Sequence, residues 1–239
     1  MRKNGTIKEV NRAQRYGFAA KTFLLGTALS LALSLTGARA GTDMKTGTDP
    51  KAITQPQLGK LCDEKEWTAE FGTGVAFSNV RVGQPCQPYT MVPVTFCASL
   101  AVDEVSLDKF LNGWFRGNTE FFFRGDYDFI THGPEHWYSG IFVGPRYNFV
   151  QPGWKFIPFI EGGVGIGFAD SNPVQQGLGQ DFNFSFEASA GFKYLLTDDM
   201  FLRLAVQYQH VSNAGLSEPK NFNNQIDALG PKLSVGFAF

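Results

Sequence analysis

Residues 182–196 read FNFSFEASAGFKYLL, and they show most clearly how this chain folds. The even positions, from Phe182 to Leu196, are apolar or aromatic. The odd positions up to Lys193 are polar or small, as at Glu187. Successive side chains of a β-strand point to opposite faces of the sheet, so this alternation predicts a strand with one apolar and one polar face.

The same two-faced alternation recurs after Trp67, in segments separated by turn-forming residues. Six segments show it clearly and two show it weakly, which makes eight predicted strands. They lie near residues 67–77, 90–101, 120–129, 137–149, 160–168, 182–196, 202–209 and 233–239. We therefore expect one all-β domain over residues 67–239, without an internal repeat or a second domain.

A soluble β-sandwich would also alternate, so the composition of the two faces decides between the architectures. The apolar face draws on 24 Phe and is too aromatic for ordinary contact with water. The polar face carries both signs of charge, which a small closed barrel needs in order to fill its interior with paired groups. These charged positions are Glu70, Glu120, Asp126, Asp128, Glu161, Glu187, Arg124, Arg146, Lys193 and Arg203. We predict an eight-stranded antiparallel transmembrane β-barrel of a bacterial outer membrane.

The lengths of the connections give the expected orientation of the barrel. Short turns alternate with longer loops, the turns near residues 151–155 and 197–199 and the loops near 78–89, 170–181 and 213–226. Outer-membrane barrels have short periplasmic turns and longer external loops. The connection 102–113 is long for the periplasmic side and leaves room for a helical turn. The last strand ends on Phe239, which resembles the C-terminal signal read by the outer-membrane insertion machinery.

The first forty residues have the composition of a cleaved secretory signal peptide. A basic segment is followed by the apolar run 23–35 and by Ala38-Arg39-Ala40, which supplies the small-residue cleavage pattern. A transmembrane anchor is the alternative, but the run is short for a span, and small residues follow it where an anchor would usually carry basic ones. We expect cleavage before Gly41, followed by a periplasmic lead-in over residues 41–66.

Other features predict little chemistry. The formal net charge of −1 gives no global positive field, so we expect no nucleic-acid partner. His132 and His136 lie in a predicted external loop, where their spacing does not make a metal site without further ligands. Cys62, Cys86 and Cys97 leave room for one disulfide in an exported chain, but the predicted strands favour no pair. We expect neither a metal nor an organic cofactor.

The segment 209–216, QHVSNAGL, carries the candidate chemistry. Counting along the strand that precedes it puts His210 and Ser212 on the lipid-facing side near the external end, where polar side chains are costly. An imidazole two positions from a serine on one strand face can take the hydroxyl proton as the oxygen attacks a carbonyl. Asn213 and the backbone amide of Gly215 are candidate donors to the resulting oxyanion. The alternative is that His210 and Ser212 are ordinary interfacial residues at a strand end.

The stretch His210-x-Ser212-Asn213-Ala214-Gly215 resembles the signature of the PagL-type lipid A 3-O-deacylases, which are eight-stranded outer-membrane barrels. The specific resemblance is confined to residues 209–216, and the general one spans the predicted barrel. It implies an esterase that hydrolyses the 3-O-linked acyl chain of lipid A in the outer leaflet. His210 would be the general base and Ser212 the nucleophile, assisted by an acidic residue on the last strand.

The acidic residue is where this chain departs from the family pattern. The family has a glutamate about a dozen residues after the serine, where this chain has Asn224. Counting back along the final strand gives Asp227 the lipid-facing side, from which it could reach His210 across the hairpin and hold its tautomer. Glu218 is closer in sequence but lies beside Pro219 in the loop. We prefer Asp227, and we expect a weakened or inactive site if neither acid reaches His210.

Two other functions are compatible with the sequence. A non-catalytic barrel serving adhesion, envelope integrity or ligand binding would leave lipid A unchanged when Ser212 is replaced. An acyltransferase barrel would add a phospholipid chain to lipid A, and it would need a pocket inside the barrel, where the sequence predicts crowded charge. The sequence leaves open the preferred acyl chain and whether two copies form a homodimer.

Overall fold

The computed structural model describes residues 65–78, 87–107 and 110–239. The predicted signal peptide and the lead-in up to residue 64 lie outside these residues. The strands are β1 (Trp67–Gly74), β2 (Ala76–Phe77), β3 (Thr90–Ala101), β4 (Gly117–His132), β5 (Trp137–Phe149), β6 (Phe156–Ala169), β7 (Phe182–Leu195), β8 (Met200–Ser212) and β9 (Ile226–Ala238). Because β1 and β2 are two parts of one strand interrupted at Val75, eight strands make up the wall.

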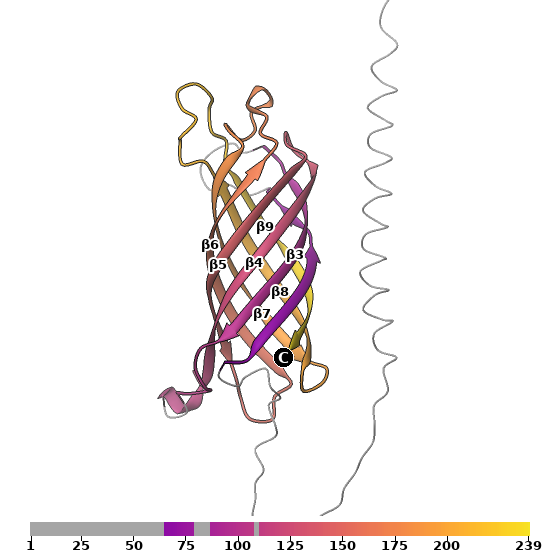
Figure 1. Ribbon diagram of the computed structural model, residues 1–239, viewed down its shortest axis with the longest axis vertical. Coiled ribbons are helices and arrows are strands. Elements are labelled where there is room, and N and C mark those ends of the chain that lie inside the picture. The colour runs from indigo at the N-terminus through magenta and orange to yellow at the C-terminus, as the bar shows by residue number, and fades with distance from the viewer. Residues whose placement is uncertain (1–64, 79–86, 108–109) are drawn as a thin grey trace, which may run out of the picture. The chain divides into compact units, whose positions relative to one another are not determined.

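The strands form one closed antiparallel barrel. Each of β3 to β8 pairs with the next strand along the chain, and the first strand closes the barrel by pairing with β9 as well as β3. Figure 1 shows the strands inclined to the barrel axis, as closure of a twisted sheet requires. The predicted fold class is confirmed.

The two ends of the barrel differ in their connections. The end that carries the C-terminus has the turns after β5 and β7, and the opposite end has the loops after β6 and β8 (Figure 1). The described helical segments are the 3-10 turns η3 (Phe110–Gly113) and η4 (Pro173–Gln175), and none of them is long and apolar enough to cross a membrane. Where a helical turn was expected between residues 102 and 113, the chain forms the short turn η3, in which Leu111 and Asn112 have left-handed backbone dihedrals.

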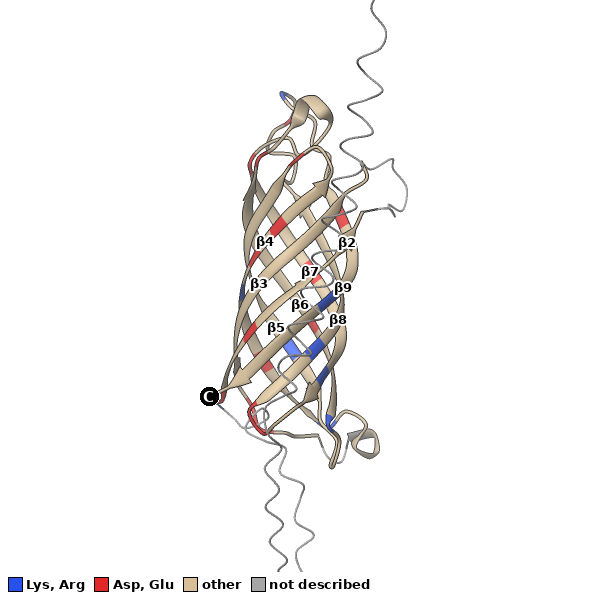
Figure 2. Cartoon of the chain, turned by 90° about the vertical axis from the view of Figure 1, so that its right-hand side faces the viewer, with Lys and Arg blue, Asp and Glu red and all other residues tan. Residues whose placement is uncertain are grey.

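The alternation read from the sequence gives the correct faces. In β7, Phe184 and Phe186 are exposed on the outside, whereas Glu187 and Lys193 are buried inside. Figure 2 shows that the charged positions of the wall recur along several strands. An outer surface of aromatic side chains around a charged interior is the arrangement of a small transmembrane barrel.

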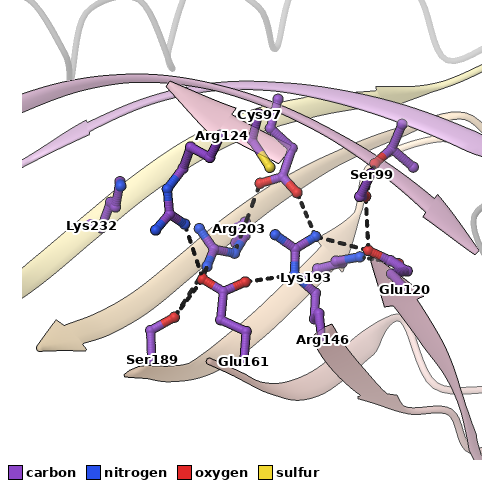
Figure 3. A network of polar contacts seen from close by, with 12 residues as sticks. Cys97, Ser99, Glu120, Arg124, Arg146, Glu161, Ser189, Lys193, Arg203 and Lys232 are labelled. Atoms are coloured by element: carbon purple, nitrogen blue, oxygen red, sulfur yellow. Dashed lines mark hydrogen bonds and ion pairs between the residues drawn. The ribbon is translucent and has the colours of Figure 1, made fainter. Parts of the chain in front are cut away.

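A network of buried ion pairs fills the interior (Figure 3). Arg146 Nη1 donates to Glu70 Oε1 at 2.6 Å and to Glu120 Oε2 at 2.9 Å. Its Nε donates to Glu161 Oε2 at 2.7 Å, and Lys193 Nζ donates to Glu120 Oε1 at 2.6 Å. A buried charge is tolerated when it is paired and hydrogen-bonded, so the network confirms the predicted filling of the interior.

Aromatic rings also lie among these charges, which the composition of the two faces did not predict. Arg203 lies over the Phe159 ring, with its guanidinium carbon 4.5 Å from the ring centroid. A cation over a ring face is stabilised by the quadrupole of the ring, most strongly away from water. Among the described residues, the inward-facing phenylalanine rings are those of Phe122, Phe142, Phe159 and Phe201, all nearly inaccessible to solvent.

Candidate active site on the outer face of the barrel

Strand register brings the candidate residues into neighbouring rows on the outside of the barrel. His210 of β8 lies opposite Phe186 of β7 and opposite Asp227 of β9. Ser212 lies two residues further toward the external end, opposite Phe184. Their neighbour Val211 is fully buried on the inside, so the outward orientation predicted for His210 and Ser212 agrees with the structure.

His210 and Asp227 are joined directly by a hydrogen bond. His210 Nδ1 lies 2.7 Å from Asp227 Oδ1, and the two side chains are 20% and 12% exposed. A neutral imidazole that donates from Nδ1 to a carboxylate has its lone pair on Nε2. The Phe186 ring stacks on the imidazole with centroids 4.9 Å apart and fixes its plane from the other side. This arrangement leaves Nε2 as the basic nitrogen.

Asp227 also accepts from Tyr208, a residue that the sequence analysis did not single out. Tyr208 Oη donates to Asp227 Oδ1 at 2.6 Å, the same oxygen that binds His210, while Gln225 Nε2 lies 3.4 Å from Oδ2. Tyr208 has the lipid-facing parity of His210, and it lies diagonally across the β8–β9 ladder from Asp227. Its lipid-facing parity is the one sequence signal that could have marked Tyr208 as a partner of Asp227, because diagonal neighbours on one sheet face are within reach of a long side chain.

The Ser212 hydroxyl accepts two hydrogen bonds. Asn223 Nδ2 donates to Ser212 Oγ at 2.9 Å, and the Ala214 N–H donates to it at 3.2 Å. A hydroxyl with two accepted bonds still has its own proton to donate. Among the described residues no hydrogen bond joins Ser212 to His210, although both lie on one strand face with Cα atoms about 6–7 Å apart. Such contacts are often long in the absence of substrate.

The two predicted oxyanion donors are engaged in the loop that follows β8. Asn213 is fully buried, and its Nδ2 donates to Ser217 Oγ at 2.9 Å. The Gly215 N–H donates to Asn213 Oδ1 at 2.9 Å. In this arrangement both groups stabilise the turn, and the donors on Ser212 are Ala214 and Asn223. Asn223 lies in an irregular loop, where no periodic pattern marks it.

The loop that carries Asn223 is tied to the rest of the external end. Asn224, the residue at the family's glutamate position, donates from Nδ2 to the Gln176 carbonyl at 2.6 Å. The other acid considered, Glu218, lies in the same loop before Pro219. Among the three positions weighed for the orienting acid, Asp227 is therefore the one hydrogen-bonded to His210.

Glu135 holds a second group of external loops together. This carboxylate is buried in the β4–β5 connection, and it accepts from Tyr89 Oη at 2.7 Å and from the Leu178 N–H at 2.6 Å. Leu178 belongs to the β6–β7 loop, which Asn221 also contacts by donating to the Gly179 carbonyl at 3.0 Å. The loop over Ser212 is thus connected through β6–β7 to Glu135.

The remaining candidates form no further site in the described residues. His136 Nδ1 lies 2.7 Å from Asp170 Oδ2. Partial burial raises the pKa of Asp170, but bonds from the Trp137 and His136 N–H groups and the His136 ring bring it below its ordinary value. The described part of the chain has no cluster of three metal-binding side chains. Cys97 is buried and free, and Cys62 and Cys86 lie outside the described residues.

Comparison with known proteins identifies the family. The model of the lipid A 3-O-deacylase (PagL) family matches residues 108–231, more than half of the chain. The outer-membrane enzyme PagL aligns at 21% identity over 70% of this chain and 97% of its own, with a TM-score of 0.46. Neisserial surface protein A aligns at 13% identity over 72% and 94%, with a TM-score of 0.45. The N-terminal barrel of Pseudomonas aeruginosa OprF aligns at 15% identity over 74% and 98%, with a TM-score of 0.44.

No curated protein sequence matches the chain. The family match nevertheless covers β4 to β8, the loop after β8 and the first half of β9, and so includes every residue of the candidate site. The chain belongs to the lipid A 3-O-deacylase family, and it is an ester hydrolase of the bacterial outer membrane.

Proposed function

We propose that the chain hydrolyses the 3-O-linked acyl ester of lipid A with Ser212 as nucleophile, His210 as general base and Asp227 as orienting acid. The observation that carries the proposal is the 2.7 Å bond between His210 Nδ1 and Asp227 Oδ1, two residues from Ser212 on the lipid-facing side. Lipid A diffuses within the outer leaflet, so a site on the outside of the barrel meets it without extracting it from the membrane.

The reaction runs in two halves. His210 Nε2 takes the Ser212 proton as Oγ attacks the ester carbonyl carbon, and the Asp227 carboxylate stabilises the imidazolium that forms. When the tetrahedral intermediate collapses, the sugar oxygen leaves with the proton from His210, and the acyl chain stays on Ser212. A water molecule then gives a proton to His210, attacks the acyl-serine, and releases the fatty acid while Ser212 recovers its proton.

Asn223 Nδ2 and the Ala214 N–H are the best-placed oxyanion donors. Each already lies within 3.2 Å of Ser212 Oγ, and the carbonyl oxygen of an attacked ester comes close to that atom. Asn213 and Gly215 could take part after the turn rearranges, since their donors are engaged within the loop. In either case the donors come from the external loop, so substrate binding and loop order are linked.

The test is mass spectrometry of lipid A from cells that express the protein or its Ser212→Ala variant. The native chain is expected to remove one 3-linked hydroxyacyl chain, and Ser212→Ala is expected to remove none. Ser139→Ala is the matched control, because Ser139 is another outward-facing serine near the external end. Identical spectra for native and Ser212→Ala, with both barrels folded, would contradict the mechanism. A gain of one palmitoyl-sized chain would indicate an acyltransferase.

Insertion by the outer-membrane machinery and assembly into a homodimer stay predictions. The outward-facing positions of the terminal strand β9 are apolar from Leu229 to Phe237, which is compatible with the first of these. Crosslinking of the protein in membranes, followed by denaturing electrophoresis, would detect the dimer.

A further inference from the structure

The β3–β4 connection carries an exposed apolar group at the periplasmic end of the barrel. We call its described residues, 102–107 and 110–116, the elbow. Four of its large apolar side chains are prominent: Leu111 is 60% exposed, Trp114 is 77% exposed, and Leu107 and Phe115 are also exposed. Exposed apolar groups of this size on a folded protein usually mark a surface that contacts a protein or a membrane.

The elbow folds outward against the lipid-facing surface. Phe115 packs on Phe149 with ring centroids 6.2 Å apart, and Tyr147 Oη donates to the Phe115 carbonyl at 2.5 Å. Tyr147 and Phe149 belong to the outward-facing set of β5, the same face as Ile141 and Val143. Figure 1 shows η3 standing out to the side of the lower end of the barrel. The elbow is therefore continuous with the surface that faces lipid.

Neighbouring elements place further aromatic side chains at this end of the barrel. Trp154 in the turn after β5 is 52% exposed, and Phe156 packs on Tyr194 with centroids 4.8 Å apart on the outer face. Tryptophan and tyrosine are enriched where a membrane protein crosses the boundary between acyl chains and headgroups. These side chains indicate the height at which the inner leaflet ends.

We infer that the elbow lies in the inner leaflet of the outer membrane, with Leu111 and Trp114 among phospholipids beside the barrel. Amphipathic segments that lie along an interface bury their apolar side chains to the depth of the headgroup boundary. A phospholipid surface is favoured over a protein partner because Phe115 and Tyr147 join the elbow directly to the lipid-facing wall. This contact is independent of the chemistry at Ser212, at the opposite end.

Tryptophan fluorescence in vesicles tests the inference. The full mature chain carrying Trp67→Phe, Trp137→Phe and Trp154→Phe retains only Trp114, and it is refolded into phosphatidylcholine vesicles. We expect a blue-shifted emission, and we expect phosphatidylcholine brominated near the glycerol end of its chains to quench about half of it or more. Water-soluble acrylamide should quench it weakly. The reference chain has all four tryptophans replaced by Phe and carries Asp198→Trp, in the exposed β7–β8 turn of the same end.

Each result decides the question. Quenching by bromolipid and protection from acrylamide, relative to the Asp198→Trp reference, support the inference. Strong acrylamide quenching without bromolipid quenching would place the elbow in periplasmic water and overturn it. Protection from both quenchers would mean that protein covers Trp114, which also overturns it. The heat-dependent shift in electrophoretic mobility shows that each variant is folded before it is measured.

Discussion

Replacing Tyr208 by Phe removes one hydrogen bond from Asp227, the proposed orienting acid, and leaves the rest of the site in place. The lost bond is the 2.6 Å contact between Tyr208 Oη and Asp227 Oδ1. A hydrogen bond to a charged group contributes about 1.5–3 kcal/mol. Asp227 keeps its bonds from His210 and Gln225, so we take the lower end. A loss of about 1.5 kcal/mol of transition-state stabilisation corresponds to roughly a tenfold fall in kcat.

The assay is the initial rate of fatty-acid release from lipid A in detergent micelles, fitted for kcat and KM separately. We expect kcat to fall, because Tyr208 positions Asp227. We expect KM to stay close to native, because the hydrogen bond of Tyr208 is to Asp227 and not to the substrate. Tyr127→Phe is the control, since Tyr127 is another lipid-facing tyrosine and stacks on Trp137 away from β8.

A double-mutant cycle separates positioning from general destabilisation. In the Asp227→Asn background, Tyr208→Phe should have little further effect, because the carboxylate that the hydroxyl holds is gone. Native kcat in Tyr208→Phe, or full additivity of the two substitutions, would refute the positioning role.

Three further substitutions test other parts of the structure. Asp227→Asn should lower kcat by a factor on the order of 10²–10⁴ without unfolding the barrel, because His210 loses the carboxylate that fixes its tautomer. The measurement is the rate of lipid A hydrolysis by Asp227→Asn, compared with that by Asp227→Glu, which keeps a carboxylate. Glu135→Gln replaces the buried carboxylate by a neutral amide, which weakens the charge-assisted bonds from the Leu178 N–H and Tyr89 Oη, and we expect faster protease cleavage of the external loops on intact cells. Arg146→Leu leaves three buried carboxylates short of a cation and should lower the free energy of unfolding by about 3–5 kcal/mol, measured by urea unfolding in micelles against Arg146→Lys.

Much of this fold could be predicted from sequence because the signal is local. Side chains of a strand alternate between its two faces, so Phe186 and Glu187 can be assigned to opposite faces without reference to any other strand. The same counting predicted that His210, Ser212 and Asp227 share the outer face, and the structure places all three there. Tyr208 has the same parity, but its contact with Asp227 depends on the register between β8 and β9, which alternation does not reveal.

The contacts between distant segments required the tertiary structure. The alternation along each strand predicts that Arg146 and Glu70 face inward. Their pairing depends on closure of the barrel, which brings β5 to face β1 across the interior. The donors on Ser212 come from a loop without periodicity, so Asn223 could not be recognised, and the engagement of Asn213 within that loop could not be foreseen.

The sequence by itself therefore determined the strands, their two faces and the residues that share the lipid-facing side, since these depend on neighbours two positions apart. The tertiary structure alone decided which residues meet. His210 reaches Asp227 because the β8–β9 register sets them opposite each other, and the elbow turns outward because Phe115 packs on Phe149. Register and loop packing depend on groups far apart in the chain, and these contacts stabilise the protein only when the barrel closes and brings the groups together.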